Sequence, residues 1–114
     1  MTIAPIELSA RATPAGKLAL SATTLDGLKS KTKYVVGGYA FYVVVARESR
    51  WTYEKGEPIL KPSLDVRVDK RTKSKDVAIR EFKKSGPGAA VLRRDPVTGD
   101  FEIVARSAGI VPPE

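Results

Sequence analysis

The chain has 114 residues, of which 42% are apolar and 29% are charged, which is the size and composition of one folded domain. It contains no cysteine and no histidine, so disulfides and zinc–thiolate sites are excluded, and enzymes that depend on a histidine base are disfavoured. Its net charge of +7 favours a negatively charged partner.

An N-terminal hairpin is the first expected element. Apolar and polar residues alternate over residues 6–12 and again over residues 17–23, as they do in half-buried strands. Pro14 and Gly16 lie between these strands, and both residue types favour turns. We expect residues 1–5 to form a flexible tail ahead of the hairpin.

The clearest strand covers residues 39–46 and follows a predicted loop or short helical turn at residues 24–32. This strand is apolar on both of its faces, and strands of this kind are usually covered on both sides. We expect a helix on one face and either another sheet or a second subunit on the other. A second subunit would make the protein a homodimer through strand 39–46, and burial within one chain is the alternative.

Two further strands are expected before the helix. Residues 51–53 favour a short strand, and residues 64–69 favour a half-buried strand because apolar and charged side chains alternate there. Gly56 and Pro58 lie between the two and predict a turn at residues 55–58.

The helix is predicted at residues 74–85, where start and stop signals agree. Ser74 is a suitable N-cap, and Asp76 lies in the first turn, where the helix dipole favours an anion. Gly86 follows the last turn, in the position where glycine commonly ends a helix.

A second hairpin is expected after the helix. Residues 89–93 and 101–106 favour strands, and the segment between them is rich in turn-forming residues. We expect residues 110–114 to form a flexible tail. The sequence therefore predicts one α+β domain: a mostly antiparallel β-sheet of about six or seven strands packed on one main α-helix, in the order β-β-β-β-β-α-β-β.

The excess positive charge is concentrated in one stretch. Residues 61–94 contain eleven Lys or Arg and four Asp or Glu, whereas the rest of the chain has nine of each. A concentrated field of one sign attracts a polyanion more effectively than the same charge spread evenly. Nucleic acid, either DNA or RNA, is therefore the expected partner.

Eight basic side chains from this stretch are the candidate phosphate contacts, because the end of strand 64–69, the loop after it and the helix can present them on one surface. They are Arg67, Lys70, Arg71, Lys73, Lys75, Arg80, Lys83 and Lys84. The alternative is a solvated helix face whose charges serve solubility.

Two aromatic residues are candidate stacking groups for unpaired bases. Trp51 and Tyr53 lie in a strand with charged neighbours, which indicates that it is partly open to water. Packing in the core is the alternative for both. Arg93 and Arg94 form a further basic pair at the tip of the second hairpin, where an ion pair with Asp95 or Asp100 is the alternative to ligand contact.

The sequence therefore favours a small, non-enzymatic nucleic-acid-binding protein. The alternative is a protein-interaction or assembly module, such as a viral or mobile-element accessory factor, whose basic face meets an acidic protein partner. We assign no catalytic residue, metal ligand or cofactor. The longest apolar run, residues 34–46, is too short to cross a membrane as a helix, and the N-terminus does not resemble a secretory signal, so we expect a cytoplasmic protein.

Overall fold

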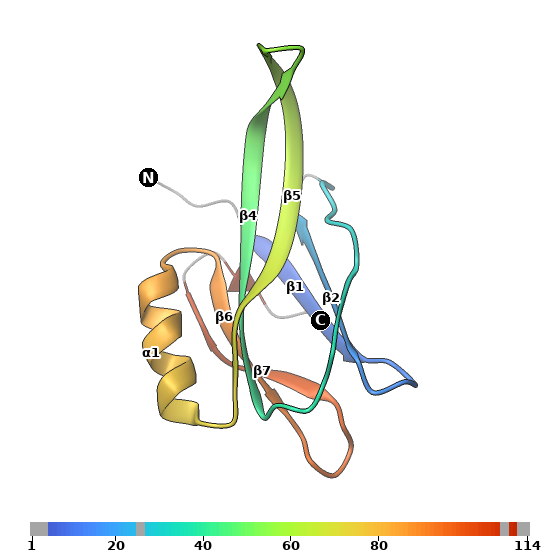
Figure 1. Ribbon diagram of the computed structural model, residues 1–114, viewed down its shortest axis with the longest axis vertical. Helices are drawn as coiled ribbons and strands as arrows, with labels where there is room; N and C mark the ends of the chain where they lie inside the picture. The colour runs from blue at the N-terminus through green and yellow to red at the C-terminus, as the bar shows by residue number, and fades with distance from the viewer. Residues whose placement is uncertain (1–4, 25–26, 108–109, 112–114) are drawn as a thin grey trace.

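Two β-sheets pack face to face, and a single helix covers the outer face of one of them (Figure 1). This computed structural model describes residues 5–24, 27–107 and 110–111, apart from the side chains of Arg50, Trp51 and Val111. The elements in chain order are β1 Ile6–Ala12, β2 Leu18–Thr24, β3 Lys33–Val35, β4 Phe41–Glu54, β5 Glu57–Thr72, α1 Lys75–Ser85, β6 Ala89–Arg94, β7 Phe101–Arg106 and β8 Ile110–Val111. The predicted α+β class is confirmed.

The first sheet has the strand order β3-β2-β1-β8. β1 and β2 form the predicted antiparallel hairpin, and β8 lies parallel to β1, with Ile110 opposite Ile6. Ile110 is 1% exposed and packs in the main core. The prediction of a flexible tail at residues 110–114 is therefore wrong for Ile110 and Val111. The remainder of that tail, and residues 1–4, lie outside the described part of the chain.

The second sheet has the order β5-β4-β6-β7, and its strand β4 is longer than predicted. The strands expected at residues 39–46 and 51–53 are one continuous strand that begins at Phe41 and not at Tyr39, because β5 pairs with β4 on both sides of the polar residues between them. An irregularity in the pairing between Ser49 and Trp51 accommodates those residues. Five strands precede the helix, as predicted, but they are not the same five. The predicted strand 51–53 is part of β4, and the short strand β3 was not predicted.

The two faces of β4 contact different layers, as its apolar sequence predicts. Tyr42 and Val44 face the first sheet in the main core, whereas Val43 packs against Ala78 of the helix. All three β4 residues are 0% exposed. For residues 42–46 the same chain supplies the cover on both faces, as in the alternative of burial within one chain.

The helix begins and ends at the predicted signals. The side chain of Ser74 accepts a hydrogen bond from the backbone N–H of Val77 at 3.4 Å, and Gly86 follows the last turn with a φ of 74°. Ile79 and Phe82 are the partly buried side chains that pack the helix on the second sheet. This helix, the only one in the described residues, is not long and apolar enough to cross a membrane.

The ends of β4 and β5 extend past the body of the domain as a two-stranded arm, residues 49–63 (Figure 1). Lys55 and Gly56 form its turn with φ values of 53° and 81°, the left-handed pair that a two-residue hairpin turn requires. The side chains of Tyr53 and Leu60 on this arm are 75% and 63% exposed. The arm accounts for much of the elongated shape, whose longest extent is 48 Å.

Candidate nucleic-acid interface

The predicted basic residues do not form one continuous surface. Residues directly opposite each other in an antiparallel sheet lie on the same face. Lys70 is opposite Val43, on the helix side of the second sheet, whereas Arg71 is opposite Tyr42, on the side of the first sheet. The basic side chains of β5 therefore divide between two faces.

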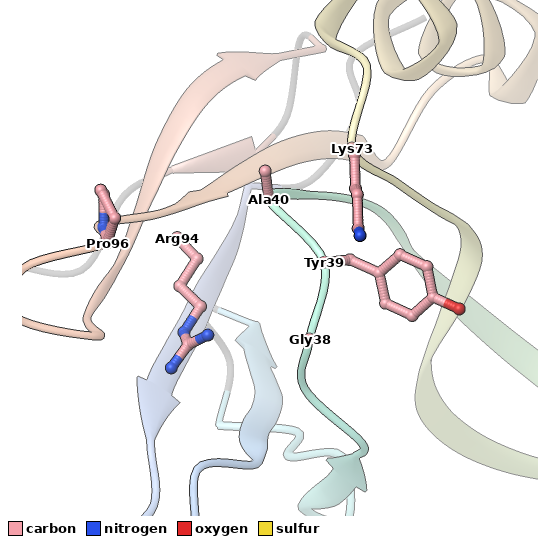
Figure 2. Close-up of a pocket in the computed structure, with 6 residues that line it drawn as sticks. All are labelled: Gly38, Tyr39, Ala40, Lys73, Arg94 and Pro96. Atoms are coloured by element: carbon pink, nitrogen blue, oxygen red, sulfur yellow. The ribbon is translucent and has the colours of Figure 1, made fainter.

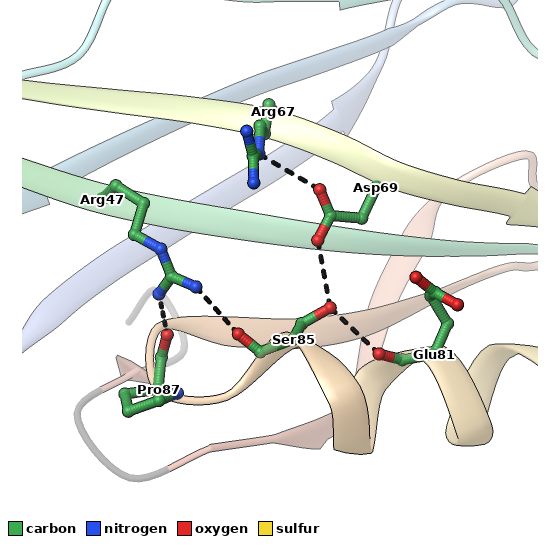
Figure 3. Close-up of polar contacts among 6 residues, drawn as sticks. All are labelled: Arg47, Arg67, Asp69, Glu81, Ser85 and Pro87. Atoms are coloured by element: carbon green, nitrogen blue, oxygen red, sulfur yellow. Dashed lines mark hydrogen bonds and ion pairs between the residues drawn. The ribbon is translucent and has the colours of Figure 1, made fainter.

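Arg67 is engaged in a structural contact. Its guanidinium pairs with the carboxylate of Asp69 at 3.1 Å, and the Ser85 hydroxyl at the end of the helix donates to that carboxylate at 3.0 Å (Figure 3). This chain of contacts fixes the helix C-terminus to β5. Arg67 is thus less available to a ligand than its charge suggests.

Arg47 holds the same end of the helix from β4. Its guanidinium donates to the backbone carbonyl of Ser85 at 2.8 Å and also to the carbonyl of Pro87 (Figure 3). The last carbonyls of a helix have no partner within the helix, so a cation placed there satisfies them and interacts favourably with the dipole. The sequence did not single out Arg47, which lies far from Ser85 along the chain.

The helix carries one shallow depression, which we call the helix groove. It has a volume of about 290 Å³ and is lined by Lys75, Asp76, Ile79, Arg80 and Lys83. Three of the predicted phosphate contacts therefore lie together here. Asp76 lies among them, which lowers the local positive charge.

A second depression, which we call the Tyr39 pocket, lies near the start of β4, where β5 and β6 end (Figure 2). It also has a volume of about 290 Å³. Its lining residues are Gly38, Tyr39, Ala40, Lys73, Arg94 and Pro96. Two cations, Lys73 and Arg94, and one aromatic residue thus line the same depression, and Lys73 is the only one of the predicted contacts in this lining.

Tyr39 is held by three contacts, one through its backbone and two through its ring. The backbone N–H of Tyr39 donates to the hydroxyl of Tyr42 at 3.3 Å, and the two rings meet edge to face with their centroids 6.2 Å apart. The guanidinium of Arg71 lies over the Tyr39 ring, 5.4 Å from its centroid, which is within the range of a cation–π interaction. Arg71, predicted as a phosphate contact, is thus next to the pocket and supports its aromatic wall.

Arg93 and Arg94 have different roles because adjacent strand residues point to opposite faces. Arg93 pairs with Glu102 on β7 at 2.9 Å, not with Asp95 or Asp100 as the alternative reading held. The backbone N–H of Arg94 donates to the carbonyl of Ala40 at 2.9 Å, and its side chain lines the Tyr39 pocket. Arg94 is half-buried and has no ion pair among the described residues.

The loop after β6 is ordered by Asp95. The backbone N–H groups of Val97 and Thr98 donate to one of its carboxylate oxygens at 2.8 Å and 3.3 Å. These two bonds, with a smaller contribution from Arg93, lower the pKa of Asp95 below its ordinary value of 3.8. The Asp95 turn therefore holds Pro96 at the edge of the Tyr39 pocket as long as the carboxyl is ionised.

The predicted stacking residues lie far from the basic residues around the helix N-terminus. Tyr53 is on the arm opposite Pro58, next to the turn, and the arm and the start of the helix lie at opposite ends of the long axis (Figure 1). The side chain of Trp51 lies outside the described part, although its backbone pairs with Leu60. Tyr53 is highly exposed, as predicted, but not near Lys73 or Lys75.

Tyr39 and Arg94 are the residues of this pocket that sequence reasoning did not place in the site. Tyr39 belongs to an apolar run, in which aromatic residues usually pack inside. The useful signal was its position after Gly37 and Gly38, where a strand has not yet begun and a ring can remain partly exposed. For Arg94 the signal was its strand position, which places it on the face opposite Arg93.

No protein-family model, curated protein or solved structure matches the chain. Among residues 5–24, 27–107 and 110–111, no cluster of three or more acidic side chains lies close enough to hold a metal ion. The fold and the site define the class only as an α+β domain of two stacked sheets and one helix, with a small pocket lined by Tyr39, Lys73 and Arg94.

Proposed function

We propose that this protein binds nucleic acid through the basic side chains at the end of β5, in the loop after it and on the helix. One observation carries the proposal. Seven of the eight predicted phosphate contacts are exposed and have no ion pair among the described residues, and Arg67 is the exception. They are Lys70, Arg71, Lys73, Lys75, Arg80, Lys83 and Lys84.

Unpaired surface cations suit a phosphate backbone for a physical reason. Each Lys or Arg that meets a phosphate releases condensed counterions, so affinity rises with the number of contacts and falls steeply with salt. A cation that already has an internal partner contributes less, because the new contact replaces an existing one. The charge pattern thus supports salt-dependent binding without base-specific contacts.

The test is fluorescence anisotropy of labelled single-stranded and duplex oligonucleotides at low and moderate salt. Replacing Lys73, Lys75, Lys83 and Lys84 together by Glu is expected to abolish binding while the fold is retained. The matched control replaces four exposed lysines elsewhere by Glu and has the same net charge. Its positions are Lys17, Lys29, Lys31 and Lys33.

If the two variants lose binding equally, only net charge matters and the proposed surface is wrong. If neither loses binding, the nucleic acid is held elsewhere. Lysozyme, another small basic protein, serves as the control for unspecific attraction. Circular dichroism of each variant shows whether the fold is retained.

A protein-interaction module remains the second candidate, in which the basic face meets an acidic protein partner. The exposed apolar side chains of the arm favour it, because Tyr53 and Leu60 are large and accessible. Capture from cell lysate with and without nuclease separates the two functions. Partners that persist after nuclease treatment support the protein interaction, and partners that disappear support nucleic-acid binding.

A further inference from the structure

We propose that the Tyr39 pocket holds one nucleotide of a single-stranded nucleic acid, with the base against the Tyr39 ring and the phosphate against Lys73 and Arg94. The inference rests on the proposed function and adds the strand type and the place of base contact. The sequence assigned the stacking of unpaired bases to Trp51 and Tyr53, so the place of base contact is new.

The size of the pocket suits a small group such as one base. At about 290 Å³ it lies just below the usual range of small-molecule sites, about 300–1,000 Å³. A base inside a duplex is paired and stacked on its neighbours, so it cannot enter such a pocket without being extruded. A base in a single strand is free to turn in, and this favours single-stranded over duplex substrates.

Tyr39 is partly open to a base. The residue is 37% exposed, and Arg71 lies over one face of its ring. The edge contact with Tyr42 restrains the ring, and the hydrogen bond from the Tyr39 N–H to the Tyr42 hydroxyl restrains its backbone, before any ligand arrives. A restrained aromatic side chain loses little conformational freedom on binding, which is the condition for an effective stacking platform.

Two cations, Lys73 and Arg94, line the pocket. Figure 2 shows Lys73 and Arg94 extending from either side of the segment that carries Tyr39. Arg94 is half-buried without an ion pair among the described residues, and a partly desolvated charge gains from an anionic partner. Gly38, which has no side chain and a φ of 110°, leaves the backbone between them open.

The test compares the affinity of the wild type and four variants for labelled oligothymidylate and for a duplex of the same length. Tyr39→Ala is expected to weaken single-strand binding by roughly 5- to 150-fold, the range for one stacked base, with little change in duplex binding. The slope of affinity against salt should not change, because Tyr39 is uncharged. Tyr39→Phe keeps the ring and should bind like the wild type.

Lys73→Ala and Lys84→Ala form a matched pair of variants that tests the phosphate contact in the pocket. Lys73→Ala should reduce the salt slope for the single strand by about 0.7, the value for one lost phosphate contact, and should weaken binding more than Lys84→Ala. Lys84 is equally a lysine but lies at the far end of the helix, outside the lining of the pocket. Equal effects of the two substitutions would contradict a phosphate site in the pocket.

Different results would refute the proposed function and the nucleotide site in the pocket. Wild-type binding no tighter than that of lysozyme would refute the function itself. Strong wild-type binding that Tyr39→Ala leaves unchanged would refute only the pocket. If Tyr39→Ala does not fold, the backbone amide resonances of residues 38–40 in the wild-type protein decide: a shift on titration with oligothymidylate supports the inference, and no shift overturns it.

Discussion

The backbone N–H of Tyr39 donates to the hydroxyl of Tyr42, 3.3 Å away. Tyr42, which is fully buried on β4, therefore fixes the backbone of Tyr39, which is exposed just before the strand. Tyr42 is 0% exposed and also meets Phe101 of β7 edge to face, with ring centroids 5.5 Å apart. The position of the pocket ring is therefore determined by the core of the sandwich.

Tyr42→Phe should loosen the pocket while leaving the core packed. The substitution removes the acceptor of the Tyr39 N–H but keeps the ring, so we expect a loss of about 1 kcal/mol in the free energy of unfolding. Urea denaturation measures it. Tyr34→Phe is the control, because Tyr34 is 65% exposed and should change stability by less than about 0.5 kcal/mol. Equal losses in the two variants would show that the Tyr42 hydroxyl has no special role.

Gly37→Ala should destabilise the wall of the pocket. A Cβ at this position would collide with the backbone carbonyl oxygen of Gly16 in the turn between β1 and β2. Neither backbone segment can move away as a flexible side chain would, so we expect a loss of about 1–3 kcal/mol, as for other overpacked sites. Thermal denaturation checks it, with Val36→Ala at the neighbouring exposed position as the control. A Gly37→Ala protein as stable as the wild type would mean that the two segments separate easily.

Arg47→Ala should weaken the attachment of the helix C-terminus. Its guanidinium donates to two backbone carbonyls beyond the reach of the helix's own hydrogen bonds, and charge-assisted bonds of this kind contribute about 1.5–3 kcal/mol when shielded from water. Because Arg47 is exposed, we expect a smaller loss, about 1 kcal/mol. Hydrogen exchange of the last helical turn should accelerate in Arg47→Ala and not in Lys84→Ala. Unchanged exchange in both variants would contradict this role.

Acid should release the loop that bears Pro96. The pKa of Asp95 is lower in the folded protein than its ordinary value of 3.8, so its contribution to stability is complete above that value. The contribution is lost as pH falls through the lowered folded pKa, because protonation weakens the bonds from Val97 and Thr98. NMR titration of the Asp95 carboxyl should give a midpoint below 3.8. A midpoint at or above it would contradict the turn geometry.

The helix and both hairpins could be predicted from the sequence because their signals are local. Ser74 and Gly86 stand at the two ends of the helix, and turn formers separate the strands of each hairpin. The continuity of β4 could not be predicted, since residues 47–50 are polar and only pairing with β5 keeps them in the strand. Ile110 resembles part of a tail until its pairing with Ile6, from the other end of the chain, is known.

The candidate site could be predicted only in part, because it too depends on pairing between segments that are distant in the sequence. A run of Lys and Arg is visible in one dimension, but the face on which each side chain lies depends on strand register. Lys70 and Arg71 are neighbours in sequence and lie on opposite faces of the sheet. Tyr39, Lys73 and Arg94 come from three separate segments, and only the pairing of β4 with both β5 and β6 brings them together.

The central claim is that unpaired cations on this domain bind a nucleic-acid strand, and the salt dependence of wild-type affinity for oligothymidylate tests it most directly. We expect tighter binding than lysozyme shows, and a linear fall of log affinity with log salt whose slope corresponds to several phosphate contacts, at about 0.7 per contact. Affinity no greater than that of lysozyme, with the same slope, would contradict the claim.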